Sequence, residues 1–168
     1  MTEKELKNLQ KYIGKRNQGQ TDEEVINHIE KINQKLPLSQ KEWHELIIPC
    51  CNNGMVKILK YVLEHISVIQ DIQKYMNHTV YGRNPDLDQK RIEVLKIFME
   101  YLEDNKKESL SEIMLQAGWF GETAIVKFLI ESGADKDYQN ANDLNLEKCA
   151  YRVAELFEDP SLKEYLGC

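Results

Sequence analysis

The sequence is poor in the residues that mark secreted, membrane-spanning and metal-binding proteins. It has four cysteines and four prolines in 168 residues, and no apolar run approaches the roughly 20 residues needed to cross a bilayer. The N-terminal segment lacks the apolar centre of a secretion signal. Cys50 and Cys51 are adjacent, which disfavours a bridge between them, and Cys149 and Cys168 do not complete a disulfide framework. We therefore expect one soluble domain with reduced thiols, in the cytoplasm and without membrane contact.

A net positive charge is also absent. The formal charge is −6 at pH 7, which argues against nonspecific nucleic-acid binding, because such binding draws its affinity from neutralised phosphates. The first sixteen residues are an exception, since they carry five basic side chains against Glu3 and Glu5. We interpret this basic segment mainly as a solvated helix face, and contact with an acidic surface is the alternative.

Motifs that carry catalysis are missing. The sequence has no Gly-x-Gly-x-x-Gly segment and no phosphate-binding loop. No two histidines have metal-ligand spacing; the four are His28, His44, His65 and His78. Cys50 and Cys51 suit small buried positions better than a nucleophilic site. We therefore expect no catalytic residue, metal or cofactor, and a cysteine-dependent enzyme remains the less favoured alternative.

No strand-like alternation is sustained over enough residues to build a sheet, whereas helix starts recur throughout. A hydroxyl residue followed three places later by Glu is the signature of a capping box, in which the two residues satisfy each other's backbone N–H groups. The pairs are Thr2 with Glu5, Thr21 with Glu24, Ser39 with Glu42, Ser109 with Glu112, and Ser161 with Glu164. The chain is therefore predicted to be all-α.

From Ser39 onward the predicted helices come in pairs. The second helix of each pair repeats one pattern (apolar, apolar, Lys, apolar, apolar) at residues 55–59, 94–98 and 125–129. Its anchors Val56, Leu95 and Val126 lie 39 and 31 residues apart. Such helix pairs leave apolar surface exposed on their own, so neighbouring pairs are expected to stack on one another.

Residues 116–121 and 125–135 resemble an ankyrin repeat, with a small-residue pair, a turn glycine at Gly121, an apolar second helix and a closing Gly-Ala-Asp. The resemblance is strong only at residues 112–140. Gly54 stands two residues before Val56 where the best unit has five, Gly82 stands thirteen before Leu95, and the family's Thr-Pro-Leu-His phrase is absent. The resemblance implies a short ankyrin-like solenoid of three to four degenerate repeats over residues 39–157. Residues 1–37 would form an N-terminal helical cap, and residues 158–168 a C-terminal capping helix.

The resemblance also implies where a partner would bind. In ankyrin-like units the two positions before the turn glycine face the concave groove, and the tail after the second helix projects as a loop. The insertion after Gly82 is a third candidate, since loops often carry specificity. The expected contact residues are Asn52, Asn53, Tyr81, Arg83, Trp119, Phe120, Asp135, Asp137 and Tyr138. An inward-folded Trp119 or Phe120 that fills space between repeats is the alternative.

These observations predict a protein–protein interaction module without catalysis, and its partner is another protein of unknown identity. The alternatives are a dedicated inhibitor or antidote that blocks one enzyme or toxin, suggested by small size and acidity, and a pathogen effector delivered into a host cell. The oligomeric state is left open, with a monomer as one reading.

Overall fold

The computed structural model describes residues 1–14, 19–102 and 106–168. Within these ranges every regular element is a helix and no strand occurs, which confirms the all-α prediction. No helix of the described chain is both long and apolar enough to cross a membrane. Lys15 and Arg16 of the basic N-terminal segment lie outside the described ranges.

The helices are α1 (Glu3–Gly14), α2 (Asp22–Lys35), α3 (Gln40–Glu45), α4 (Ile47–Asn52), α5 (Val56–Leu63), α6 (Ile72–Val80), the 3-10 turn η2 (Pro85–Leu87), α7 (Asp88–Met99), α8 (Lys106–Phe120), α9 (Thr123–Glu131), α10 (Leu146–Phe157) and α11 (Ser161–Leu166).

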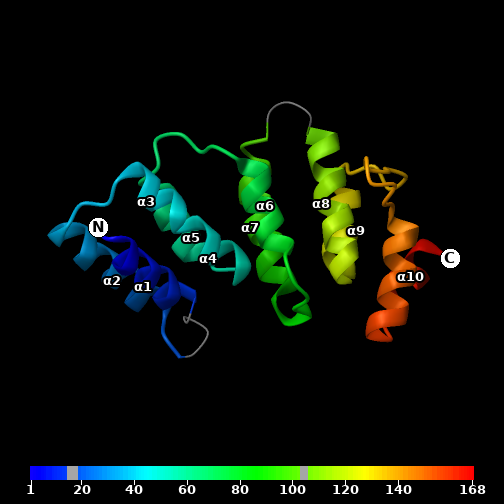
Figure 1. Cartoon of the computed structure of the whole chain (residues 1–168), viewed down its shortest axis with the longest axis horizontal. Helices are drawn as coiled ribbons and strands as arrows, with labels where there is room; N and C mark the ends of the chain where they lie inside the picture. The colour runs from blue at the N-terminus through cyan, green and yellow to red at the C-terminus, as the bar shows by residue number, and fades with distance from the viewer. Residues whose placement is uncertain (15–18, 103–105) are drawn as a thin grey trace.

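The helices pack in two rows that follow the order of the chain (Figure 1). The inner row is α1, α4, α6, α8 and α10, each in contact with the next. Behind it, the outer row is α2, α5, α7 and α9, also in contact in that order. Each inner helix packs on the outer helix that follows it in sequence, and α10 packs on α11. Consecutive pairs therefore cover one another's apolar sides, as the sequence pattern requires.

Three of the five expected capping boxes are present at helix starts, formed by Thr2, Thr21 and Ser39 with the Glu three residues on. The other two expectations are wrong. Ser109 lies inside α8, where its hydroxyl donates to Gln73 Oε1 instead. Ser161 makes no cap bond, and its backbone N–H donates to Asp159 Oδ1.

The first helix after residue 39 is broken in two, and Pro49 explains the break. Proline has no N–H, so the carbonyl of Glu45 four residues earlier loses its helical partner. The side chain of Gln10 in α1 donates to that carbonyl at 3.0 Å. The broken helix therefore ties the first pair of helices to the next, because the orphaned acceptor is satisfied from α1.

The turns after α4 and α8 are built alike. Gly54 and Gly121 both adopt positive φ, +62° and +76°, a conformation that glycine enters without a steric penalty. In each turn the residue after the glycine donates its N–H to a carbonyl five residues back. These bonds are Met55 to Cys50 (2.9 Å) and Glu122 to Ala117 (3.0 Å).

This common geometry changes the internal alignment. When Gly54 is matched to Gly121, Val126 is equivalent to Leu59. The alignment by the lysine pattern had instead made Val126 equivalent to Val56. Leu59 and Val126 are fully buried, whereas Val56 is only partly buried. The lysine pattern is thus displaced by three residues in its first copy. The unequal spacing at Gly54 disappears once the turns set the register, whereas Gly82 still stands thirteen residues before Leu95.

Close packing at Gly121 leads to a stability prediction. A Cβ there would lie 2.7 Å from Arg83 Nη1 and 2.9 Å from Val153 Cγ1. Gly82 has a similar φ of +80° but open space around it. Gly82→Ala should cost about 1 kcal/mol of unfolding free energy from backbone strain alone, and Gly121→Ala about 2–4 kcal/mol because overpacking adds to it. Urea unfolding followed by circular dichroism measures both, and equal losses would contradict the packing at Gly121.

Candidate functional site

The candidate site lies on the inner row at what we call the lower edge, the edge formed by the turns after α4, α6, α8 and α10. Helices α6, α8 and α10 run in the same direction, so their C-terminal turns come side by side (Figure 1). The lower edge therefore gathers residues that are far apart in sequence.

An aromatic cluster occupies this edge. The Tyr81 and Phe120 rings meet edge to face, with centroids 5.1 Å apart. Tyr81 is 63% exposed and Trp119 39% exposed, while Phe120 is half-buried. The alternative of an inward-folded Trp119 therefore does not describe this structure. Phe157, which is 40% exposed, extends the cluster from α10.

Arginine holds the cluster together. The Arg152 guanidinium lies 3.9 Å from the centroid of the Trp119 ring and donates to the Trp119 carbonyl at 2.5 Å. Arg83 lies 4.9 Å from the Phe157 centroid and pairs with Asp159 at 2.5 Å. Cations over aromatic faces are attracted by the ring quadrupole. Trp119 and Phe157 thus each have an arginine against the ring.

The expected contact residues fall into separate groups. Tyr81, Arg83, Trp119 and Phe120 are brought together at the lower edge. Asn52 and Asn53 belong to the neighbouring turn and are half-buried, and Asn53 Nδ2 donates to the Pro49 carbonyl at 2.9 Å.

The three residues of the projecting tail lie elsewhere. They follow α9, near the opposite end of α8 from the aromatic cluster. Asp135 pairs with Lys107 at 2.9 Å, and Tyr138 donates to Glu112 at 2.6 Å. Asp137 is exposed. Whether any of these residues contacts a partner stays a prediction.

Arg152 and Phe157 were missed by reasoning from the sequence. They belong to α10, and their contacts with Trp119 and Arg83 cross between elements more than thirty residues apart. One signal was present in composition, because the chain has eighteen Lys and only four Arg. Three of those four arginines, Arg83, Arg91 and Arg152, lie at the lower edge. Arginine suits this place because its planar fork bonds several acceptors and stacks on rings.

Beneath the aromatic cluster lies a buried ion pair. Arg91 and Glu122 are 3% and 0% exposed, with Nη1 and Oε1 3.2 Å apart. Both stand four residues before the buried anchor of their outer helix, a position that Met55 fills in the first pair. Met55 is apolar, whereas Arg91 and Glu122 are charged and face one another across neighbouring pairs.

Arg91 also closes the turns around it. Its two terminal nitrogens donate to the carbonyls of Gly82 (3.0 Å), Tyr81 (3.3 Å) and Asn52 (3.5 Å). These carbonyls belong to the C-terminal ends of α4 and α6, where a cation is favoured by the helix dipole. One guanidinium therefore joins three successive pairs, since its carboxylate partner comes from the next one.

Glu122 is bonded from two sides as well. Its Oε1 also accepts from the backbone N–H of Asn84 at 2.5 Å, which fixes the loop that carries Arg83. Burial raises the pKa of the nearby Asp88 to about 7; the Glu122 carboxylate adds to the rise, and Arg91 and Arg83 oppose it. The cluster thus holds two arginines and two acidic groups in a water-poor edge of the stack.

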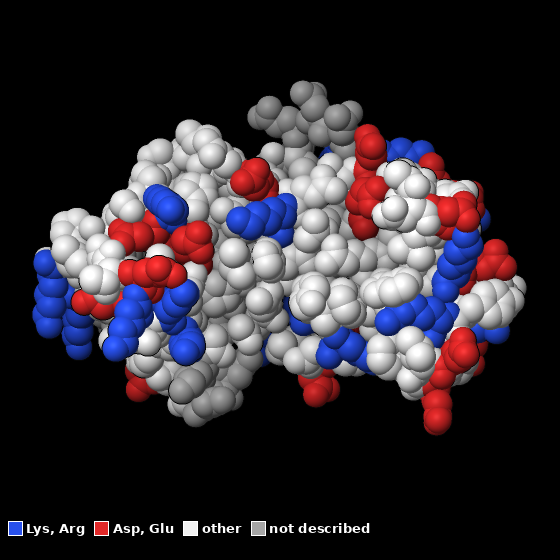
Figure 2. Space-filling view, in the orientation of Figure 1, with Lys and Arg blue, Asp and Glu red and all other residues white. Residues whose placement is uncertain are grey.

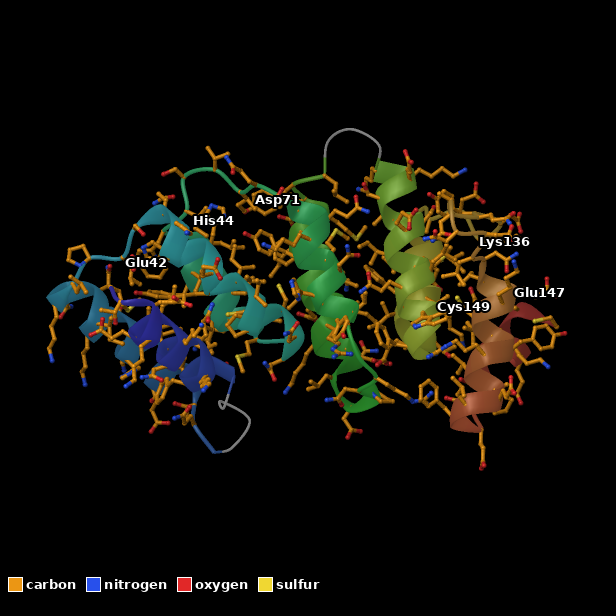
Figure 3. The ribbon with its side chains drawn as sticks, viewed as in Figure 1. Glu42, His44, Asp71, Lys136, Glu147 and Cys149 are labelled. Atoms are coloured by element: carbon orange, nitrogen blue, oxygen red, sulfur yellow. The ribbon has the colours of Figure 1, made fainter. Side chains whose placement is uncertain are left out.

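The geometry offers little for metal or thiol chemistry. Among the described residues, no group of three or more His, Cys, Asp or Glu is placed to hold a metal ion. Cys50, Cys51 and Cys149 are buried, and Cys149 lies between α8 and α10 (Figure 3). Burial raises the pKa of Cys51 to about 12 and that of Cys149 to about 11, so these thiols stay protonated at neutral pH.

Comparison of this chain with known protein families, with characterised proteins and with solved structures found no match.

The buried pair generates a first prediction for this site. Arg91→Met should lower the unfolding free energy by about 3–5 kcal/mol, because it leaves the Glu122 carboxylate buried without its counter-charge. Methionine fits the position in size, since Met55 fills the equivalent one. Arg83→Met is the matched control. It breaks a pair whose side chains are 27% and 23% exposed and should cost about 0–1 kcal/mol. If urea unfolding showed similar losses of unfolding free energy for Arg91→Met and Arg83→Met, the buried pair of Arg91 and Glu122 would not have the stabilising role described here.

Asp88 generates a pH prediction. Its pKa is raised in the folded chain, so between about pH 4 and pH 7 the folded state binds more protons than the unfolded state. The unfolding free energy should therefore fall as the pH rises across this window, by at most about 1.4 kcal/mol per pH unit from this group. Asp88→Asn should remove that contribution, and Asp86→Asn, an exposed neighbour in η2, should keep it. An unchanged slope in Asp88→Asn would rule out the raised pKa.

Proposed function

We propose that this chain is a short ankyrin-like helical solenoid that binds a partner protein through its inner face, without catalysis. The observation that carries the proposal is the cluster of Tyr81, Trp119 and Phe120, exposed or half-buried yet held in fixed positions at the lower edge. The partner remains unidentified, and the proposal concerns the surface that meets it.

The physical argument rests on what such a cluster does at an interface. Aromatic side chains bury a large area with few rotatable bonds, and Trp, Tyr and Arg dominate the residues that carry binding energy. Here Arg152 and Phe120 already restrict the rings, so little conformational entropy is lost on binding. Monomeric soluble proteins rarely keep large apolar patches exposed without a use. Together these points favour a binding surface.

The ankyrin-like part of the proposal is supported by the repeated turns. The turns at Gly54 and Gly121 share φ sign, hydrogen bonding and burial pattern over a distance of two repeat lengths of about 33 residues. Inner helices followed by outer helices in register are what stacked repeats produce. The spacing that still differs is the longer connection between Gly82 and Leu95, which contains η2.

A cysteine-dependent enzyme is the alternative from another class, and burial argues against it. The pKa of Cys50 is raised far above its usual range by removal from water, and the adjacent Cys51 adds to the effect. A thiol acts as a nucleophile only as the thiolate. A solvent-excluded thiol of this kind has neither the charge nor the access that catalysis needs.

The proposal predicts the effect of removing two anchors. Tyr81→Ala combined with Trp119→Ala should weaken partner binding at least about 100-fold, because truncation of central aromatic anchors typically costs 2 kcal/mol or more each. Helicity should not change, since both side chains are exposed. The measurement is affinity capture from native extract with wild-type and variant chains, quantified by mass spectrometry.

The matched control replaces two aromatics of similar exposure outside the lower edge. Tyr101 and Tyr165 are 45% and 39% exposed, and their joint replacement by Ala should leave capture intact. A partner held equally well by the Tyr81 and Trp119 double variant would contradict binding through this cluster.

A further inference from the structure

A groove of about 250 Å³ lies along α8 on the inner face. It is lined by residues of α6, α8 and the segment before α10. Four of these carry side-chain amides: Gln73, Asn77, Gln116 and Asn140. Trp119 is the lining residue nearest the C-terminal end of α8, so the groove leads to the aromatic cluster. A ligand for this groove should therefore carry hydrogen-bonding groups for the amides and an apolar group for the aromatic cluster.

Some donors and acceptors of these side-chain amides make no hydrogen bond within the described part of the chain. Gln73 Oε1 accepts from Ser109 Oγ at 3.2 Å, and the Gln73 Nε2 group has no partner in the described part of the chain. The Asn77 side chain likewise makes no hydrogen bond to any described residue. Gln116 Nε2 donates to the Asn77 carbonyl at 3.3 Å, and no described residue donates to Gln116 Oε1. Donors and acceptors thus stand side by side along the groove.

Charge is nearly absent from the same groove. Among its described lining residues, Glu112 alone is ionisable, and its carboxylate already accepts from the Tyr138 hydroxyl at 2.6 Å. Figure 2 shows a mostly uncharged strip across the middle of the inner face, between charged groups on either side. Such a lining does not compensate a phosphate or an ammonium group. It suits a neutral ligand that offers both N–H and C=O groups, and a peptide backbone is the polymer that does so.

The length of the groove sets the length of the ligand. Along α8 the lining residues run from Glu112 to Trp119, an advance of seven residues, or about 10 Å at about 1.5 Å per residue. An extended chain covers that distance with about four residues, at about 3.3 Å each. One face of the Trp119 ring is covered by Arg152, which leaves the other face for an apolar side chain of the ligand.

We infer that the groove binds an extended, uncharged segment of about four residues from the partner protein. Gln73 and Asn77 hydrogen-bond to its backbone, and an apolar side chain at one end packs on Trp119. The inference rests on the proposed function and deepens it, because it assigns the partner's contact to one short segment. Backbone recognition gives affinity, and the aromatic end gives specificity.

The test uses a library of random peptides of about twelve residues displayed on phage, selected on the immobilised full chain. Enriched peptides are then synthesised, and their dissociation constants are measured by fluorescence polarisation. The test variant is Gln73→Glu with Asn77→Asp. It preserves size and the acceptor for Ser109 but replaces the free donors with charge. The matched control is Gln34→Glu with Asn27→Asp on α2, which adds the same charge at exposed positions.

The expected result is a shared uncharged core of about four residues with one apolar or aromatic side chain. The affinity should fall at least about tenfold in the test variant, as the loss of two neutral hydrogen bonds implies, and should stay unchanged in the control. Peptides that lose binding in Tyr81→Ala with Trp119→Ala but not in the test variant would overturn the groove and leave the proposed function standing. A selection without enriched peptides would also overturn it, while affinity capture decides the proposed function separately.

Discussion

The lower edge of this molecule depends on one buried guanidinium. Arg91 donates to three carbonyls at the ends of two inner helices and pairs with Glu122 of the next unit. Burial of a charge in a protein is costly unless it is both paired and hydrogen-bonded. The arrangement meets these requirements for Arg91 only when three successive turns keep their relative positions. A lysine could not replace it, because a single ammonium lacks the planar fork that reaches acceptors on several sides.

This constraint has a direct effect on the surface. Tyr81 supplies both a carbonyl to Arg91 and a ring to Phe120, so the exposed aromatic cluster is attached to the buried pair through one residue. Glu122 holds the Asn84 backbone, and Arg83 next to it reaches Phe157 and Asp159. The rigid presentation of the cluster therefore follows from a polar network beneath it. For the partner binding that we propose, such preorganisation would lower the entropy lost on contact.

The sequence predicted the helical class, the turn glycines and most of the inner and outer apolar faces, because these depend on local periodicity and on conformations that glycine favours. It predicted the capping boxes of Thr2, Thr21 and Ser39 but was wrong at Ser109, where α8 begins earlier, and at Ser161, which makes no cap bond. It misplaced the first copy of the lysine pattern, because the turn glycine sets the register and the position of the lysine does not. Arg91 and Glu122 could not be predicted as a pair. They are 31 residues apart in sequence, and only the packing of adjacent helix pairs brings them together. The candidate site was found in part: Tyr81, Arg83, Trp119 and Phe120 converge, whereas Arg152 and Phe157 meet them only through tertiary packing.

We propose that a partner binds the inner face and not the outer row. Hydrogen–deuterium exchange of the full chain, with and without its captured partner, tests this most directly. The account predicts slower exchange in α6, α8 and the turns of the lower edge on binding, with α5, α7 and α9 unchanged. Protection confined to the outer row, with the turns at residues 81–84 and 119–122 unaffected, would contradict it.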